Sequence, residues 1–416
     1  MPTPSLLIVP ARFKTGRLYS QIPTANGDFT VTRNTTATRL NDAGVIESVA
    51  SGIPRLDYSV SGFVTGCPAL LVEPAATNEI RNNSNTNAVT GTPGTLPTNW
   101  TETLAGLTRS VIALGAENGV QYIDVRLSGT ANATEALINF ESPTQTVASN
   151  GQVWTNSCFL KSISAPVPYT GLRLSTVERT SGGIFVASGN SPDLTLTSTL
   201  NRFSFTRTLS GGGTVARVQS RISFGLVSGT AYNFTVRIGY PQMELGSVAT
   251  SVIPTTTGTG SRSADVISVS GAVSGSIGQT EGVLYIECES NNGEDDVFNI
   301  NRSAANAITI YKNANNSYLG RIYHSSTSII FTSASGVTGT VKIAVAYKSG
   351  DSTMYLNGAR VGTLRTDAIT FGAALNYLGV DKSSAFFSGI KPSRIRAVAL
   401  YNTRLTDAEL ATLTTP

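Results

Sequence analysis

Hydrophobic and polar residues alternate along much of the middle and final thirds of the chain. Residues 120–127 and 232–238 place an apolar side chain at every second position, and residues 283–288 and 341–347 continue the pattern. Stretches rich in Gly, Ser and Asn divide these runs. Successive side chains of a strand point to opposite faces, so alternation indicates strands with one buried and one wet face. The sequence therefore predicts an all-β fold with two β-sandwich (jelly-roll) domains after an extended N-terminal segment.

Changes in this pattern divide the chain into three parts. Residues 1–90 contain short strand-like runs with few aliphatic residues. These residues have too few aliphatic side chains to form a core of their own, so we expect them to lie against a neighbouring domain or another chain. Residues 91–254 and 265–416 each carry a full strand series and are predicted as separate sandwiches. Composition marks residues 81–99 and 255–263 as linkers.

Two short signals predict local structure near the C-terminus. Asn357-Gly358 stands between apolar runs, which is the residue pair that a tight hairpin turn favours. Thr406 is followed by Glu409 three residues later, the spacing of a capping box at the start of a short helix. The chain has no heptad repeat, so no coiled-coil stalk is expected.

Composition narrows the class of protein further. Only 13% of the residues are charged, 40% are hydrophobic and the formal net charge is +4, which does not fit a disordered chain. Basic residues are scattered, so no nucleic-acid partner is expected. No stretch approaches the apolar length of a membrane span, and the start lacks the pattern of a signal peptide, so we expect synthesis and folding in a cytoplasm without membrane insertion. Cys67, Cys158 and Cys288 are odd in number and widely spaced, which favours free thiols over a disulfide framework or a zinc site.

Catalytic motifs are sparse. His324 is the single histidine, which argues against Ser-His-Asp and Cys-His mechanisms unless it is itself the base. Glu287 and Glu289 alternate onto one face of a predicted strand and would be the acids of a glycosidase, although two glutamates on a half-wet sheet are more often simply solvated. The sequence therefore predicts a protein that is not an enzyme.

The last third of the chain resembles laminin-G and concanavalin-A-like jelly rolls. The resemblance rests on residues 354–358, residues 387–390 and the closing segment 395–410, which ends in the letters LTDAEL. The middle third is similar to carbohydrate-binding-module sandwiches at residues 153–155 and 240–255. These likenesses imply glycan-binding β-sandwiches.

The first third is similar to a segment of bacteriophage head-spike and head-fibre proteins. The matching stretches are residues 29–39, 44–47, 54–58 and 71–78. The resemblance implies that the protein is a structural appendage of the virion. It also implies that residues 1–90 attach this appendage to the particle and mediate its assembly. Exposed strand edges in so thin a segment are normally paired or covered, so we expect a homo-oligomer. The resemblance to phage fibres suggests a trimer and implies contact with phage capsid or tail proteins. Attachment to head, neck or tail stays open.

A glycan site of this class needs aromatic side chains beside amides and carboxylates. Trp154 alternates with polar neighbours and is expected in the core, whereas Trp100 opens its domain and could serve either role. Tyr311, Tyr318 and Tyr323 lie in an Asn-rich region of the last domain and complete the candidates.

One oxygen-rich cluster is the candidate metal site. It holds Asn291, Glu294, Asp295 and Asp296. Calcium takes six to eight oxygen ligands, and the cluster could supply part of such a site, but a polar turn is the favoured interpretation. No other cofactor is expected.

These inferences lead to one expected function and two alternatives. We expect a virion appendage whose sandwiches adhere weakly and multivalently to glycans of the host surface. A capsid cement or decoration protein that binds only virion proteins is the first alternative. A polysaccharide depolymerase is the second.

Overall fold

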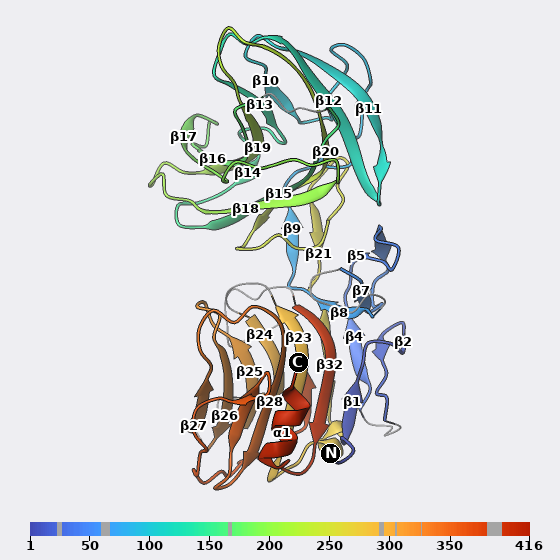
Figure 1. Ribbon diagram of the computed structural model, residues 1–416, viewed down its shortest axis with the longest axis vertical. Helices are drawn as coiled ribbons and strands as arrows, with labels where there is room; N and C mark the ends of the chain where they lie inside the picture. Colours follow the sequence, from blue (N-terminus) through green and yellow to red (C-terminus); the bar gives the residue numbers. More distant parts are fainter. Residues whose placement is uncertain are drawn as a thin grey trace. The chain divides into compact units, whose positions relative to one another are not determined.

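The structure is a computed structural model that describes residues 1–22, 27–59, 67–164, 169–290, 295–303, 306–325, 327–380 and 393–416. The chain is almost entirely β-structure, which confirms the predicted fold class. It divides into two compact units (Figure 1). Unit 1 combines residues 1–75 with residues 263–416, and unit 2 comprises residues 76–262.

Unit 1 is a sandwich of two antiparallel sheets. Within the described residues, sheet A runs in the order β30 (Ala359–Arg360), β29 (Thr353–Leu356), β28 (Gly339–Lys348), β23 (Glu281–Ser290), β32 (Ser393–Tyr401), β8 (Ala69–Val72) and β7 (Arg55–Asp57), with β1 (Leu6–Ile8) also paired to β32. Sheet B runs β2 (Phe13–Lys14), β3 (Arg17–Leu18), β4 (Phe29–Thr32), β22 (Val266–Ser270), β31 (Tyr377–Gly379), β24 (Asp295–Ser303), β25 (Asn306–Lys312), β26 (Tyr318–His324) and β27 (Thr327–Thr332). β5 (Ala37–Leu40) and β6 (Ile46–Val49) form a separate hairpin.

The N-terminal segment is part of the C-terminal sandwich. The structure thus divides the chain differently from the expected boundaries at residues 90, 254 and 265. β1 and β8 lie end to end along the same side of β32, and β4 pairs with β22 in the other sheet. Leu6, Phe29 and Leu70 are buried in the same core as the C-terminal strands. The aliphatic surface that residues 1–75 lack on their own is therefore supplied by the same chain.

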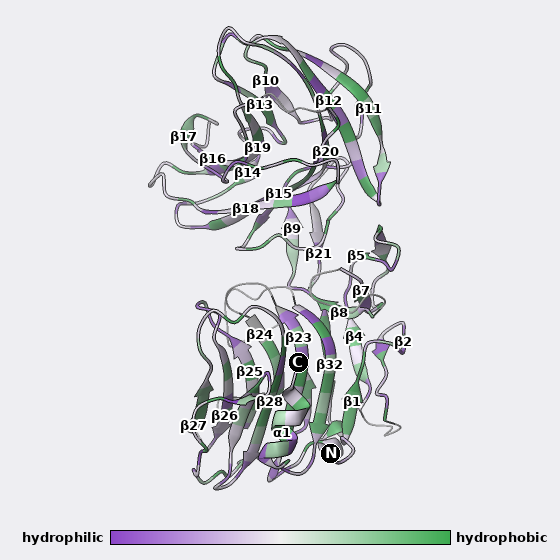
Figure 2. Cartoon of the chain, viewed as in Figure 1, coloured by the Kyte–Doolittle hydropathy of each residue, from purple (hydrophilic) through white to green (hydrophobic). Residues whose placement is uncertain are grey.

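The core of unit 1 follows from strand alternation. Its inward side chains are mostly Ile, Val, Leu and Phe, and Figure 2 shows this hydrophobic character along β1 and β32. A smaller apolar cluster on the outer face of sheet A packs against helix α1 (Asp407–Thr414) through Leu410. Thr406 and Glu409 form the predicted capping box of this helix. Asn357 and Gly358 both have positive φ between β29 and β30, as the predicted tight turn requires. The short 3₁₀ helix η1 (Ala272–Ser276) follows β22.

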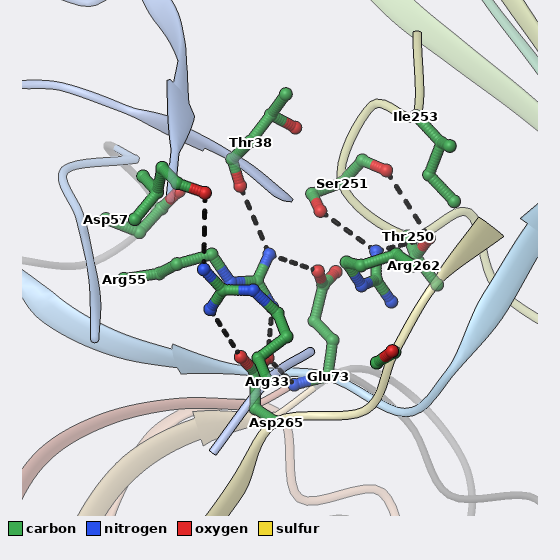
Figure 3. Close-up of polar contacts among 12 residues, drawn as sticks. Arg33, Thr38, Arg55, Asp57, Glu73, Thr250, Ser251, Ile253, Arg262 and Asp265 are labelled. Atoms are coloured by element: carbon green, nitrogen blue, oxygen red, sulfur yellow. Dashed lines mark hydrogen bonds and ion pairs between the residues drawn. The ribbon is translucent and has the colours of Figure 1, made fainter. Parts of the chain in front are cut away.

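Two buried arginines and two buried carboxylates lie together in unit 1 (Figure 3). Arg55 pairs with Glu73 at 2.6 Å and with Asp265, while Arg33 pairs with Asp265 at 3.0 Å. Burial alone would lower the pKa of Arg55, but attraction to Asp265 and Glu73 outweighs it and raises the pKa above its ordinary value. The Glu73 amide also donates to Asp265, and the Asp265 amide donates to the Glu73 carbonyl. We call these four residues the buried ion network; it joins the chain before residue 75 to the chain after residue 263.

Unit 2 is a second sandwich of two antiparallel sheets. Among its described residues, sheet C contains β10 (Thr101–Thr103), β13 (Glu135–Asn139), β19 (Arg217–Gly225), β16 (Gly171–Arg179) and β17 (Phe185–Asn190), with β14 (Thr146–Val147) also paired to β19. Sheet D contains β11 (Thr108–Glu117), β12 (Val120–Thr130), β20 (Ala231–Leu245), β15 (Val153–Ser162) and β18 (Asn201–Thr208). β9 (Ala76–Asn78) pairs with β21 (Gly260–Arg262).

The two segments expected to be linkers are structured and, except for Ser263, lie in unit 2. Asn82 and Asn83 are buried, and the Asn83 side chain accepts a hydrogen bond from the Thr255 amide at 2.7 Å. Thr255 in turn accepts from the Asn83 amide at 3.0 Å and donates to the Ile80 carbonyl at 2.6 Å. Polar composition alone predicts linkers here, whereas these amides and hydroxyls satisfy backbone groups of the unit.

Cys158 and Cys288 are buried in the cores of units 2 and 1, and Cys67 is exposed; none of the three forms a disulfide with a described residue. Burial raises the pKa of Cys158. In the part of the chain that the structure describes, no helix has the length and apolar character needed to cross a bilayer.

Candidate functional site

The outer face of sheet B gathers most of the predicted aromatic candidates. Ile308 and Ile310 of β25 point into the core, so Thr309 and Tyr311 point outward. Ile322 of β26 likewise lies in the core, which places its neighbours Arg321 and Tyr323 on the same outer face. The described helix α1 packs against sheet A, the opposite sheet of the sandwich.

Strand register brings the outward residues into contact distance. Asn299 of β24 is opposite Thr309, and Thr309 is opposite Arg321 of β26. Tyr311 and Tyr323 flank this row, one on β25 and the other on β26. We call the five residues Asn299, Thr309, Tyr311, Arg321 and Tyr323 the tyrosine face. Hydrogen-bonded strands lie about 4.8 Å apart, so the face has the width of a single sugar ring or two.

Arg321 is the centre of the tyrosine face. Its guanidinium carbon lies 4.4 Å from the centroid of the Tyr323 ring, a cation–π arrangement. Its Nη2 donates to the Ser328 hydroxyl at 3.3 Å. Burial raises the pKa of Tyr311, and Arg321 acts against that shift. The guanidinium therefore holds both tyrosine rings in one polar and aromatic group.

Two polar atoms of this face lack partners. Thr309 Oγ1 and Arg321 Nε are buried and make no hydrogen bond to any described residue. Thr309 is only 4% exposed, and Asn299 beside it is only 3% exposed. Most buried polar atoms in folded proteins are hydrogen-bonded, so a donor and a hydroxyl left open on one face point to a ligand that pairs with them.

Tyr377 extends the same face toward β31. Leu378 is in the core, so Tyr377 and Gly379 point outward. The Tyr377 hydroxyl lies over Gly379, at the place where a side chain would begin. Gly379 is opposite Asn299. The absence of a side chain at residue 379 thus lets a third tyrosine lie along the sheet next to the tyrosine face.

The structure separates the predicted glycan-binding residues. Tyr311 and Tyr323 lie together, as expected for a site. Tyr318 is fully buried in the core on the other side of the same sheet. Trp100 is buried in the core of unit 2, where its ring meets Phe140 edge-on with centroids 4.8 Å apart and its indole N–H donates to the Asn82 carbonyl. These two positions correct the prediction, because neither ring has a face open to a ligand.

The candidate calcium ligands fall mostly outside the described part of the chain. Asn291 and Glu294 lie outside the described residues. Asp295 and Asp296 begin β24, with only their backbone described. Among the described residues, no group of three acidic, histidine or cysteine side chains is arranged to hold a metal ion. The calcium site therefore stays a prediction.

Sequence reasoning missed Asn299, Thr309 and Arg321. The available signal was alternation: positions 309 and 311 of one run share a face, as do 321 and 323 of the next. What alternation cannot give is the pairing of these two runs in the register that joins Thr309 to Arg321.

The candidate catalytic groups are not assembled into a site. On sheet A, the Glu287 carboxylate forms an ion pair with the Arg396 guanidinium at 3.3 Å. His324 ends β26 on sheet B and contacts the Thr327 hydroxyl. The two glutamates considered as glycosidase acids, Glu287 and Glu289, both lie on β23 of sheet A, whereas His324 lies on sheet B.

Comparison with known proteins bears on the fold of unit 1. Residues 275–411 match the concanavalin A-like lectin/glucanases superfamily, about a third of the chain. This part of unit 1 is similar to concanavalin A-like jelly rolls, in line with the predicted resemblance, and residues 1–75 add strands to both sheets of the sandwich. A search of curated proteins found no match.

Several solved structures are similar over parts of the chain. The leech intramolecular trans-sialidase shares 16% identity over 33% of this chain with a TM-score of 0.28, and the chain spans only 23% of that enzyme. Domain 4 of an extracellular arabinanase from Geobacillus stearothermophilus, in complex with arabinotriose, shares 13% identity over 41% of this chain and 83% of its own, with a TM-score of 0.30. The baseplate tripod of bacteriophage Tuc2009 shares 16% identity over 74% of this chain and 99% of its own, also at 0.30. Because these TM-scores are low, the function of this chain is argued below from its own residues.

Proposed function

We propose that the protein is a glycan-binding component of a bacteriophage particle, and that it binds sugars on the tyrosine face of sheet B. The observation that carries the proposal is the meeting of Tyr311, Arg321 and Tyr323 around polar atoms without partners. The jelly roll of unit 1 and the resemblance of residues 29–78 to phage head-spike and head-fibre proteins support it.

The chemistry of the face suits a carbohydrate. A sugar ring has apolar C–H groups on its faces and hydroxyls at its edge, and tyrosine offers an apolar ring with a polar end. Arg321 Nε can donate to a sugar hydroxyl, and Thr309 Oγ1 can donate or accept. Satisfying these buried atoms adds binding free energy, because neither makes a hydrogen bond to the residues that the structure describes.

Single-site affinity on an open sheet face is expected to be weak. The face has few polar groups, so a dissociation constant near the millimolar range is the expectation, about −4 kcal/mol. Many copies on a particle raise the overall affinity by about two to four orders of magnitude. Adhesion to a surface that repeats the same glycan is therefore the function that this geometry supports.

Glycan arrays with the full chain, displayed multivalently on beads, test the proposal. Tyr311→Ala and Tyr323→Ala should each weaken binding at least about tenfold, which corresponds to roughly 1.4 kcal/mol. Arg321→Lys keeps the charge but loses the planar donor group and the stacking on Tyr323, so it should also weaken binding.

Tyr19→Ala is the matched control. Tyr19 is a partly exposed tyrosine of unit 1 that also lies near cations, Arg12 and Lys14, and it follows β3 at the far edge of sheet B. Binding should survive this change. If the wild-type chain binds no glycan, or if Tyr19→Ala weakens binding as much as Tyr311→Ala, the tyrosine face is not a glycan site.

We propose further that binding is not coupled to cleavage. The Glu287 carboxylate is engaged by Arg396, and His324 belongs to the other sheet. A reducing-end assay on host capsule polysaccharide tests this. Release of sugar ends that disappears in Glu287→Gln would instead make the protein a depolymerase.

The place of the protein on a virion rests on sequence resemblance and is tested on particles. Immunogold labelling of purified virions should mark a surface appendage and distinguish head, neck and tail. Binding to capsid proteins with no glycan binding would favour a decoration protein. A homotrimer rests on the resemblance to phage fibres alone, because unit 1 itself supplies the partner strands for residues 1–75; sedimentation of the full chain tests it.

A further inference from the structure

A second polar face lies on the outer side of sheet C in unit 2. Leu172 and Leu174 of β16 and Ile222 of β19 point into the core, so the residues that alternate with them point outward. The outward residues of these two neighbouring strands include four arginines: Arg173, Arg179, Arg217 and Arg221. We call this surface the arginine face.

The register of the sheet places these side chains next to one another. Arg179 is directly opposite Arg217, and Arg221 is directly opposite Ser175. On its other side, Arg221 is opposite Asn139 of β13. The side chains of Asn139, Arg221 and Ser175 therefore form one row across three strands.

Three of the four arginines form no ion pair with a described residue. Arg173 pairs with Asp193 at 2.6 Å. No carboxylate of the described residues lies within ion-pair distance of Arg179, Arg217 or Arg221. Arg179 donates instead to the Gln219 side chain at 2.8 Å and to the Gly183 carbonyl at 3.0 Å. Arginines on a protein surface are common, but several on one sheet face without a carboxylate leave a local excess of positive charge.

Burial makes this excess costly. Desolvation lowers the pKa of Arg221, and attraction to Glu135 does not offset it. Desolvation also lowers the pKa of Arg179, and repulsion from Arg221 lowers it further. An anion placed between the two guanidinium groups would remove both penalties.

Unpartnered polar atoms lie at the same place. Arg221 Nε, Ser175 Oγ and Asn139 Oδ1 are buried and make no hydrogen bond to any described residue. Ser175 has no exposed surface. These atoms belong to the one row across β13, β19 and β16, and they offer two donors and an acceptor side by side. A cluster of this kind in a folded protein indicates a missing partner.

We propose that the arginine face binds a saccharide that carries a carboxylate, such as a uronic-acid unit. The carboxylate would lie between Arg221 and Arg179, because the guanidinium group forms paired, coplanar hydrogen bonds with a carboxylate. Ser175 and Asn139 would bond the sugar hydroxyls. This site is separate from the tyrosine face: it lies in unit 2, and its ligand is chosen by charge.

Titration of the full chain with four probes tests the proposal. The probes are an oligogalacturonide, a neutral oligogalactan of the same length, a sulfated oligosaccharide and a single-stranded oligonucleotide. The oligogalacturonide should bind at least tenfold more tightly than the other three, and added salt should weaken it. Arg221→Met and Arg179→Met should each reduce this binding at least tenfold. Arg221→Lys should restore only part of it, because lysine cannot form the paired bonds.

Arg126→Met is the matched control. Arg126 lies on the other sheet of unit 2, where its Nε donates to Asn233 at 2.7 Å, and the change removes the same charge from the same unit. Binding of the oligogalacturonide should survive it. Trp100 and Trp154 are both buried in unit 2, so their fluorescence checks that each variant is folded.

Two results would overturn the proposal. One is equal binding of the oligogalacturonide and the neutral oligogalactan by the wild-type chain, a comparison that needs no variant. The other is equal or tighter binding of the oligonucleotide or the sulfated sugar, which would make the face a general anion surface. Neutral-glycan binding reports on the tyrosine face, and the difference between acidic and neutral sugars reports on the arginine face. The two proposals therefore fail separately.

Discussion

Arg55→Met should destabilise unit 1 and leave unit 2 unchanged. Arg55 has no exposed surface; it pairs with Glu73 and Asp265 and donates to the Thr38 carbonyl at 3.1 Å. Methionine fills part of the space but leaves two buried carboxylates with less compensation. Breaking a buried ion pair in this way costs about 3–5 kcal/mol. That is a large share of a domain stability of about 5–15 kcal/mol.

The expected effect on thermal unfolding follows from that free energy. For a unit of this size, each kcal/mol shifts the melting temperature by about 2–4 °C, so Arg55→Met should lower it by about 6–20 °C. Both tryptophans, Trp100 and Trp154, lie in unit 2. Tryptophan fluorescence therefore follows unit 2, while circular dichroism or calorimetry also detects unit 1.

Arg17→Met is the control for this experiment. Arg17 is a partly exposed arginine of unit 1 that lies 3.7 Å from Asp28, and its loss should change the stability by less than about 0.5 kcal/mol. Adding Glu73→Leu to Arg55→Met should recover part of the loss, because one uncompensated carboxylate is removed. An unchanged melting temperature in Arg55→Met, or an equal loss in Arg17→Met, would refute the role given to the buried ion network.

Two further predictions concern the same unit. Burial would raise the pKa of Asp57, but Arg394 at 3.0 Å and hydrogen bonds to Ser59 and Leu40 outweigh it, so the folded-state pKa lies below its ordinary value. This contribution to stability is present above the unfolded pKa of about 3.9 and is lost as pH falls through the folded pKa. In Asp57→Asn, the free energy of unfolding measured with urea should therefore fall less steeply at acid pH. An unchanged pH dependence would contradict the role given to Asp57. Deletion of residues 1–75 should prevent unit 1 from folding while the tryptophan transition of unit 2 persists; a folded C-terminal sandwich in the truncated chain would contradict the shared core.

Local structure was predictable wherever a few neighbouring residues decide it. The hairpin turn at Asn357-Gly358 needs two residues that tolerate positive φ, and both do so here. The cap at Thr406 and Glu409 needs only a hydroxyl and a carboxylate three positions apart. An all-β fold likewise followed from alternation. None of these depends on a distant part of the chain.

Part of the tyrosine face was predictable for the same reason, and the rest was not. Tyr311 and Tyr323 were marked by their residue type and region. Tyr318 has the same type and region, yet it is one position out of phase with the outer face and enters the core. The sequence did not decide whether Trp100 is a core residue or a surface residue, because an aromatic side chain at the start of a domain can be either. Thr309 has no distinguishing residue type; only its register opposite Arg321 gives it a role.

The sequence alone determined the strands, their inner and outer faces and the sharp turns, because these depend on side-chain alternation and on the backbone preferences of single residues. The tertiary structure decided which strands pair. Ser5 hydrogen-bonds to Leu400, 395 residues away, and Arg33 pairs with Asp265 across 232 residues. No local pattern encodes a partner at such a separation, because pairing is selected by the whole core that the two segments bury together. That selection joined residues 1–75 to the C-terminal sandwich and set the registers that form the tyrosine and arginine faces.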